Sequence, residues 1–272
     1  MTLILEYIAR TAVPVEVEGL IPSALRDKGL GEIAKMPIAV GNRTLPAAEL
    51  FRISGNAADE RIEMHGDLSG VHWIGANMDC GEIRVLGRAG RHVGSEMSGG
   101  VITVEGDAGD WLGGQMRGGL IRVRGQAGHL VGAAFRGSPR GMSGGTILVH
   151  GRAGNEIGHR MRRGLIAVGG AEDAVGFNML AGTILVFGPC GMRPGAGMRR
   201  GTLGLFGEPR PNLLPTFRFA CRLKPLIRAM LFRELDRLAF PVPPSLRDAD
   251  CDMFHGDFVA LGRGEVFLIA GA

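Results

Sequence analysis

The stretch GGQMRGGLIRVRG, residues 113–125, decides the fold of this 272-residue chain, because close copies of it recur along the sequence. Each copy has a methionine, a glycine three residues later and then two aliphatic residues separated by one position. The seven methionines are Met78, Met97, Met116, Met142, Met161, Met179 and Met198, spaced by 18 or 19 residues except for one step of 26. Self-similarity at a fixed period predicts a repeat architecture and argues against a single phosphate-binding loop.

The aliphatic residues predict one short strand per copy. They form the pairs Ile83 and Val85, Ile102 and Val104, Ile121 and Val123, Ile147 and Val149, Ile166 and Val168, Ile184 and Val186, and Leu203 and Leu205. Alternation places both members of a pair on one face of a strand, and only stacking of the copies can bury that face. We therefore expect residues 66–207 to form an all-β, single-stranded parallel β-helix of about seven coils of 19 residues.

Other repeat folds fit these copies less well. Leucine-rich repeats require leucine and asparagine columns, and calcium-binding nonapeptide coils require a recurring aspartate, neither of which is found here. A left-handed hexapeptide β-helix, the scaffold of many acyltransferases, also has about 18 residues per coil. Its six-residue aliphatic period does not run through the copies, so this fold ranks second.

The segments flanking the repeats define two further regions, residues 1–65 and 208–272. The first has strand-like runs at residues 3–7, 15–19 and 36–42 and a short helical piece at residues 46–51, and we expect it to cap the column. The second begins with a Pro-rich extended piece. Helical spacing of apolar residues then predicts a helix over residues 219–240, with Pro225 near its start. A terminal hairpin over residues 254–271 follows. The helix is expected to cap or dock beside the column, because open β-helix ends need covering.

Composition narrows the class of protein. No apolar run approaches membrane-spanning length and no charged leader precedes LILEYIA, which predicts a soluble cytoplasmic chain. The four cysteines are far apart with no CxxC pair, so free thiols are favoured over a metal site. The long step between methionines reflects a single insertion at FRGSPRG, residues 135–141, whose glycines and proline favour a loop.

Arginines mark one edge of the predicted column. They directly follow the methionines at Arg117, Arg162, Arg163, Arg199 and Arg200, and the insertion adds Arg136 and Arg140. Equivalent residues stack in a coil, and stacked like charges repel unless they are solvated or meet an anion. Two interpretations stay open: a solvated face, or a binding stripe for carboxylates, which guanidinium groups bind in bidentate fashion. Nucleic acid is disfavoured because few aromatic residues interleave with the arginines.

Motifs for catalysis are missing from the sequence. The seven histidines show no HxH or HExxH spacing, there is no GxSxG elbow, and GDAGDWLGG lacks the lysine of a phosphate-binding loop. His129 and His159 occupy related positions in successive copies and are expected at the surface. The sequence thus predicts no catalytic residue, no metal ligand and no cofactor on this chain.

The repeats closely resemble the GXGXG-type β-helix shared by the C-terminal domain of glutamate synthase and the C subunit of formylmethanofuran dehydrogenase. The flanks favour the second: MPIAVGNRTLPAAELFRISG, residues 36–55, and FHGDFVALGRGEVFL, residues 254–268, resemble the segments that flank the β-helix in those C subunits. The resemblance covers most of the chain.

This resemblance implies a non-catalytic scaffold subunit in one-carbon metabolism. In methylotrophic bacteria, related chains belong to a formyltransferase/hydrolase complex that moves formyl from tetrahydromethanopterin to a methanofuran-type carrier and releases formate during formaldehyde oxidation. The preference for arginine over lysine suits a GC-rich bacterial genome and favours this setting. The resemblance places the metal and the chemistry on partner subunits of a hetero-oligomer, and a polyglutamate-type carrier tail is a further candidate partner.

Two other settings remain open. One is the C subunit of a tungsten- or molybdenum-dependent formylmethanofuran dehydrogenase, as in methanogens. The other is a linking or channel module like the glutamate synthase domain. A hexapeptide-type acyltransferase ranks third.

Overall fold

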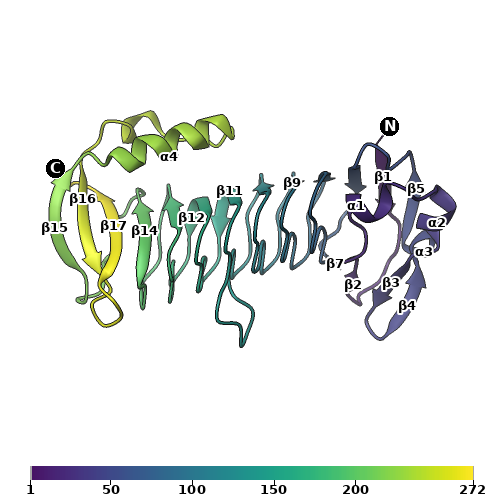
Figure 1. Ribbon diagram of the computed structural model, residues 1–272, viewed down its shortest axis with the longest axis horizontal. Helices are drawn as coiled ribbons and strands as arrows, with labels where there is room; N and C mark the ends of the chain where they lie inside the picture. Colours follow the sequence, from purple (N-terminus) through teal and green to yellow (C-terminus); the bar gives the residue numbers. More distant parts are fainter. Residues whose placement is uncertain (1, 272) are drawn as a thin grey trace.

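The protein is an elongated column of stacked coils closed at each end by a different cap (Figure 1). A computed structural model describes residues 2–271. One sheet of 13 strands runs through the whole length, and a four-stranded sheet lies near the N-terminal end. The predicted all-β parallel β-helix is therefore confirmed. Because one ladder crosses all three sequence regions, their division at residues 65 and 207 stays a proposal.

Each predicted aliphatic pair lies on a parallel strand of the column, and one further strand, β6 (Arg61–His65), precedes the predicted repeats. The strands that carry the pairs are β8 (Glu82–Val85), β9 (Val101–Val104), β10 (Leu120–Val123), β11 (Thr146–Ala153), β12 (Leu165–Ala171), β13 (Thr183–Val186) and β14 (Arg200–Leu205). Like residues pair across coils, so that Ile121 lies between Ile102 and Ile147. All the paired isoleucines and valines are fully buried, which stabilises the stack through continuous apolar contact.

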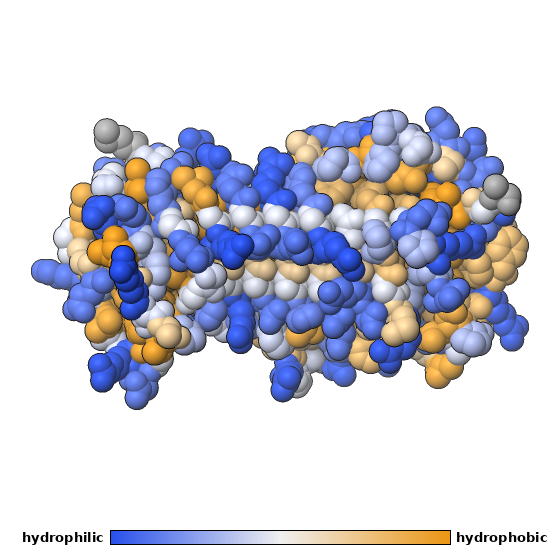
Figure 2. Space-filling model, turned by 180° about the vertical axis from the view of Figure 1, so that it is seen from behind, coloured by the Kyte–Doolittle hydropathy of each residue, from blue (hydrophilic) through white to orange (hydrophobic). Residues whose placement is uncertain are grey.

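A second column of small residues lines another side of each coil. Isolated parallel bridges connect Leu68, Ala89, Ala108, Ala127 and Ala153 in sequence, and another joins Ala171 to Cys190. The rows of like residues appear on the surface as stripes along the length of the molecule (Figure 2).

The methionine and glycine columns fit one another across successive coils. Met116 is fully buried, and a Cβ atom on Gly145 of the next coil would lie 2.7 Å from the Met116 Cε. Gly145 also has φ +86°, a conformation that glycine adopts without strain. The flexible thioether therefore fills the space that the next glycine leaves open.

The N-terminal cap extends both sheets. Its elements are β1 (Leu3–Tyr7), β2 (Val15–Glu16), α1 (Pro22–Leu25), α2 (Leu30–Ala34), β3 (Pro37–Val40), β4 (Arg43–Pro46), α3 (Ala47–Leu50), β5 (Phe51–Ser54) and β7 (Val71–His72). β1 pairs in parallel with β6 and antiparallel with β5, so it continues the main ladder. The small sheet has the order β4-β3-β2-β7. The expected strands and short helix of this region are confirmed.

The C-terminal cap corrects one prediction. Its elements are β15 (Arg218–Leu223), α4 (Leu226–Arg237), a 3-10 turn (Pro244–Leu246), β16 (Cys251–Gly256) and β17 (Arg263–Ile269). The predicted hairpin is confirmed, since β16 and β17 pair antiparallel. The helix predicted over residues 219–240 was wrong in its first part, where β15 pairs with β16 instead.

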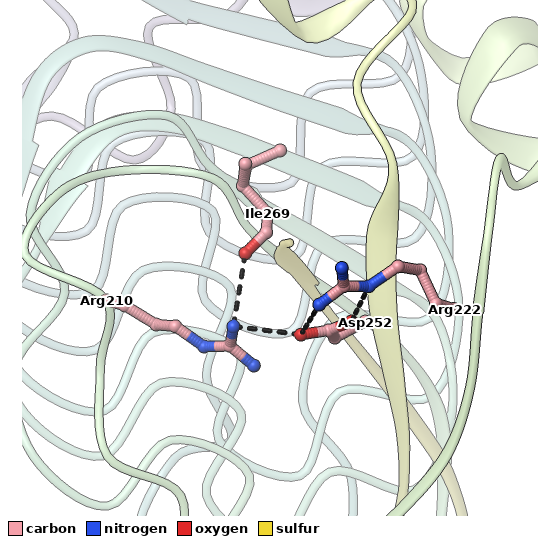
Figure 3. Close-up of polar contacts among 4 residues, drawn as sticks. All are labelled: Arg210, Arg222, Asp252 and Ile269. Carbon is pink, nitrogen blue, oxygen red and sulfur yellow. Dashed lines mark hydrogen bonds and ion pairs between the residues drawn. The ribbon is translucent and has the colours of Figure 1, made fainter. Parts of the chain in front are cut away.

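Pairing with a distant strand explains why residues 218–223 are extended. Asp252 on β16 is nearly buried and accepts hydrogen bonds from Arg222 at 2.8 Å and Arg210 at 2.9 Å (Figure 3). Arg210 also donates to the Ile269 carbonyl oxygen at 3.3 Å. These charge-assisted bonds fix β15 and the Pro-rich segment on the hairpin. The helix begins only after Pro225, which lacks the N–H that a helix interior needs.

Helix α4 docks on the outer face of the last coils, as expected. Outward-facing Leu148, Ala167 and Leu185 are buried in a cluster with Phe232 and Leu235 of the helix. Arg122 donates to the Leu238 carbonyl oxygen at 3.0 Å at the C-terminal end of the helix. The same outward face carries charged residues in the earlier coils. In the last coils it is apolar, because α4 covers it and removes it from water.

The insertion projects from one coil without interrupting the stack. β10 and β11 pair in register on either side of it. The loop extends beyond the edge of the column where the strands begin, and the turn between β16 and β17 projects beyond the same edge (Figure 1).

Candidate anion-binding groove

A groove lies between the insertion and the β16–β17 turn. Its volume is about 880 Å³, and Pro139 of the insertion and Leu261 of the hairpin form opposite parts of its lining. Six arginines line it: Arg140, Arg160, Arg162, Arg163, Arg199 and Arg200. We refer to it as the arginine groove.

The repeat places four of these arginines, Arg162, Arg163, Arg199 and Arg200, directly after a methionine. The backbone N–H of Arg162 donates to the Met142 carbonyl oxygen and that of Arg199 donates to the Met179 carbonyl oxygen, each at 2.8 Å. Because each methionine side chain is buried inside the coil, the residues that follow it point outward. Their side chains are exposed, so the cationic groups of stacked coils face the same solvent-filled space.

The charge of the groove is not balanced by the protein. No aspartate or glutamate lines it. Within residues 2–271, no ion pair involves Arg140, Arg162, Arg163, Arg199 or Arg200. Arg160 donates to the Ser138 carbonyl oxygen at 3.1 Å and so ties the insertion to the column. Several uncompensated guanidinium groups around one hollow create a positive potential that attracts anions, and carboxylates match their paired donors.

Two predicted arginines lie outside the groove, and one of its arginines was missed. Arg117 pairs with Glu96 at 2.5 Å. Arg136 lines a separate hollow of about 280 Å³ with Trp111 and Phe135. The repeat pattern could not predict Arg160, because it precedes its methionine and no other copy has an arginine at that position.

An aromatic stack beside the insertion was also missed. The rings of Trp73 and His92 are stacked with centroids 3.9 Å apart, and those of His92 and Trp111 with centroids 5.3 Å apart. Phe135 of the insertion contacts the first two rings at 6.1 and 5.5 Å. Burial, followed by the nearby charges of His72 and Arg91, lowers the pKa of His92 to about 4. His92 is therefore neutral at pH 7, and the stack anchors the loop that carries Arg140.

Nothing in the groove points to bond-making chemistry. Among the described residues, no group of three or more histidine, cysteine, aspartate or glutamate side chains could hold a metal ion. His159, expected at the surface, is only 18% exposed because its ring packs on Phe177 at 5.3 Å. Burial is also the main cause of its lowered pKa. None of the helices between residues 2 and 271 is long and apolar enough to cross a membrane.

The fold and groove define a parallel β-helix protein with an arginine-rich edge. No protein-family model matches the chain, so the wider GXGXG kinship with glutamate synthase stays a prediction. The chain is 36% identical over 85 residues to the C subunit of the molybdenum-containing formylmethanofuran dehydrogenase 1 of Methanosarcina barkeri. It is 39% identical over 85 residues to the C subunit of the tungsten-containing formylmethanofuran dehydrogenase 2 of Methanothermobacter thermautotrophicus. These matches cover 30% of this chain and 28% and 32% of those relatives.

A solved structure matches over nearly the whole chain. It is a chain of the formyltransferase/hydrolase complex (FhcABCD) from Methylorubrum extorquens in complex with methylofuran, with a TM-score of 0.92 and 32% identity. The match covers 98% of this chain and 100% of that one. This protein belongs to the family formed by the C subunits of formylmethanofuran dehydrogenases and of formyltransferase/hydrolase complexes.

Proposed function

We propose that this chain is a non-catalytic scaffold subunit of a hetero-oligomeric formyltransferase/hydrolase complex. The complex would transfer formyl from tetrahydromethanopterin to a methanofuran-type carrier and release formate. One observation carries this proposal: the full-length match to a chain of such a complex, at a TM-score of 0.92. As the family resemblance implies, the metal and the chemistry would lie on partner subunits. A cytoplasmic location is part of the same proposal.

The arginine groove has carboxylates as its proposed ligands. The resemblance implies glutamate-derived carboxylates on the carrier, and the neighbour's complex contains methylofuran. The pair Arg162 and Arg163 lies two coils from the pair Arg199 and Arg200, with Leu180 and Ala181 on the coil between them. Cations spread along the groove in this way suit an extended anion with several charges better than a single small one. We assign the groove to a polyglutamate-type tail.

Purification of the tagged chain from its own organism tests the subunit proposal. Mass spectrometry should identify formyltransferase and hydrolase subunits in fixed stoichiometry, and the chain alone should turn over no formylated carrier. Turnover by the isolated chain, or its purification as a homo-oligomer without those subunits, would contradict the proposal.

The dehydrogenase setting is the second candidate, since the curated relatives carry that name. Metal analysis of the purified complex separates the two. Stoichiometric tungsten or molybdenum would favour the dehydrogenase, and its absence together with formyltransferase activity would favour the hydrolase complex.

A further inference from the structure

The turn between β16 and β17 exposes four consecutive apolar residues: Phe258, Val259, Ala260 and Leu261. Val259 is 80% exposed and Phe258 is 53% exposed. Single exposed apolar residues are common on proteins. An uninterrupted run of them at the tip of a hairpin is unfavourable in water, and its presence indicates a function. We call residues 257–262 the apolar tip.

The apolar tip is held rigidly on the last coil. Asp257 is buried, and its carboxylate accepts hydrogen bonds from the backbone N–H of Gly197 at 2.9 Å and of Val259 at 3.0 Å. The Asp257 carbonyl oxygen accepts two more, from Ala260 and Gly262. The turn backbone is thus fixed before any ligand arrives, which reduces the entropy lost on binding.

The apolar tip adjoins the arginine groove. Leu261 lines the groove itself. A second hollow of about 480 Å³ is lined by Arg199, by Val259 and Leu261 of the tip, and by Asp257, whose carboxylate is held by the backbone N–H groups of Gly197 and Val259. The protruding apolar side chains of the tip therefore adjoin the cations of the groove.

The shape of this surface decides what kind of ligand fits it. A small molecule is usually enclosed in a concave, mostly apolar pocket, whereas Val259 protrudes. A polyglutamate tail or a nucleic acid would satisfy the arginines but would leave the apolar residues in water. A folded protein can receive an apolar protrusion in a socket and surround it with acidic residues, as buried anchors at interfaces do.

We propose that the apolar tip docks into a partner protein, in an apolar socket bordered by aspartate or glutamate side chains that face the arginine groove. This inference rests on the proposed function, because the partner is taken to be another subunit of the same complex. The part of the groove toward the insertion is left for the carrier.

Co-expression of the tagged chain with the other three subunits of its complex tests the proposal, with assembly followed by native mass spectrometry and affinity by titration. Val259→Asp should weaken assembly at least tenfold, because a charge enters an apolar socket with an acidic border. Val259→Ile should assemble like the wild type. Leu226→Asp is the matched control, since Leu226 is 86% exposed on α4, which lies toward the opposite edge of the column (Figure 1). The loss caused by Val259→Asp should persist at high salt, because apolar burial is not screened.

Wild-type assembly by Val259→Asp would overturn the docking role and leave the proposed function intact. An equal loss from Leu226→Asp would overturn it as well, since the effect would then not be specific to the tip. Failure of the wild-type chain to assemble with these subunits would overturn the proposed function and the docking role together.

Discussion

The two halves of the column differ at the residues that flank the buried methionines. In the N-terminal half these positions include Asp79, Glu96 and Arg117, and the last two form an ion pair across neighbouring coils. In the C-terminal half the equivalent positions hold five arginines and no acidic residue. The interior is the same in both halves, with methionine under glycine and aliphatic pairs in register. The fold therefore does not require the arginines, and we propose that their accumulation at one end serves binding.

The largest expected effect comes from replacing an equivalent glycine by alanine in each half of the column. Equal losses of stability would show that the two halves have the same interior. A Cβ atom on Gly94 would lie 2.4 Å from the Ile121 Cδ1, and one on Gly158 would lie 2.3 Å from the Ile184 Cδ1. Both glycines also have positive φ, of 64° and 70°. Gly94→Ala and Gly158→Ala should each lower the free energy of unfolding in urea by roughly 2 to 4 kcal/mol, from overpacking and left-handed strain together.

Gly137→Ala provides the control, since Gly137 has φ +84° but no atom near its missing Cβ. It should cost only the strain, about 1 kcal/mol. Unequal losses at Gly94 and Gly158, beyond about 1 kcal/mol, would mean that the interiors of the two halves are not equivalent.

Removal of the arginines should affect binding and leave the stack intact. Each exposed charge pair contributes about 0.2 to 1 kcal/mol, so changing Arg162, Arg163, Arg199 and Arg200 together to glutamine should weaken binding of a polyglutamate peptide by roughly 1 to 4 kcal/mol at low salt. The loss should shrink as salt rises. Isothermal titration measures binding, and circular dichroism checks the fold. Wild-type affinity of the quadruple variant at low salt would show that this edge is only a solvated face.

The sequence was most informative where the structure is periodic. Aliphatic pairs, methionines and glycines recur because each coil meets an equivalent neighbour, so local pattern and long-range contact coincide. The cap was harder to predict: β15 depends on Asp252 and a partner strand some 30 residues away, and helical spacing alone could not reveal this. The groove was predicted only in part. Arg140 reaches it through a loop anchored on a stack of Trp73, His92 and Trp111, rings whose common spacing of 19 residues is visible in the sequence.

The contacts of Asp252 with Arg222 and Arg210 in the C-terminal cap should make the stability of the protein depend on pH. The repeats predict no such dependence. Hydrogen bonds from Arg222, above all, and from Arg210 lower the pKa of Asp252 despite its burial. Because the folded pKa lies below the unfolded value of about 3.9, the contribution is present above that pH and is lost as the pH falls through the folded pKa. Asp252→Asn should therefore cost roughly 1 to 2 kcal/mol at pH 7, and less at pH 3.

Urea unfolding of the wild type and of Asp252→Asn at pH 3 and pH 7 measures this loss of stability. The other carboxylates are the same in both proteins, so their contributions cancel in the difference. A loss that is the same at pH 3 and pH 7 would mean that the Asp252 side chain acts through packing and not through its charge.

The smallest effect is expected at Arg117, the arginine that already has a partner. Its ion pair with Glu96 is exposed on the arginine side, so Arg117→Gln should change the free energy of unfolding by at most about 1 kcal/mol. Polyglutamate affinity should remain that of the wild type, because Arg117 lies outside the groove and Glu96 neutralises its charge. Arg199→Gln is the matched variant, since it makes the same chemical change after the methionine of another coil, inside the groove. It should weaken binding at low salt while leaving stability unchanged. Equal binding losses for the two variants would show that position along the column does not matter, and the contrast between the halves would then carry no functional meaning.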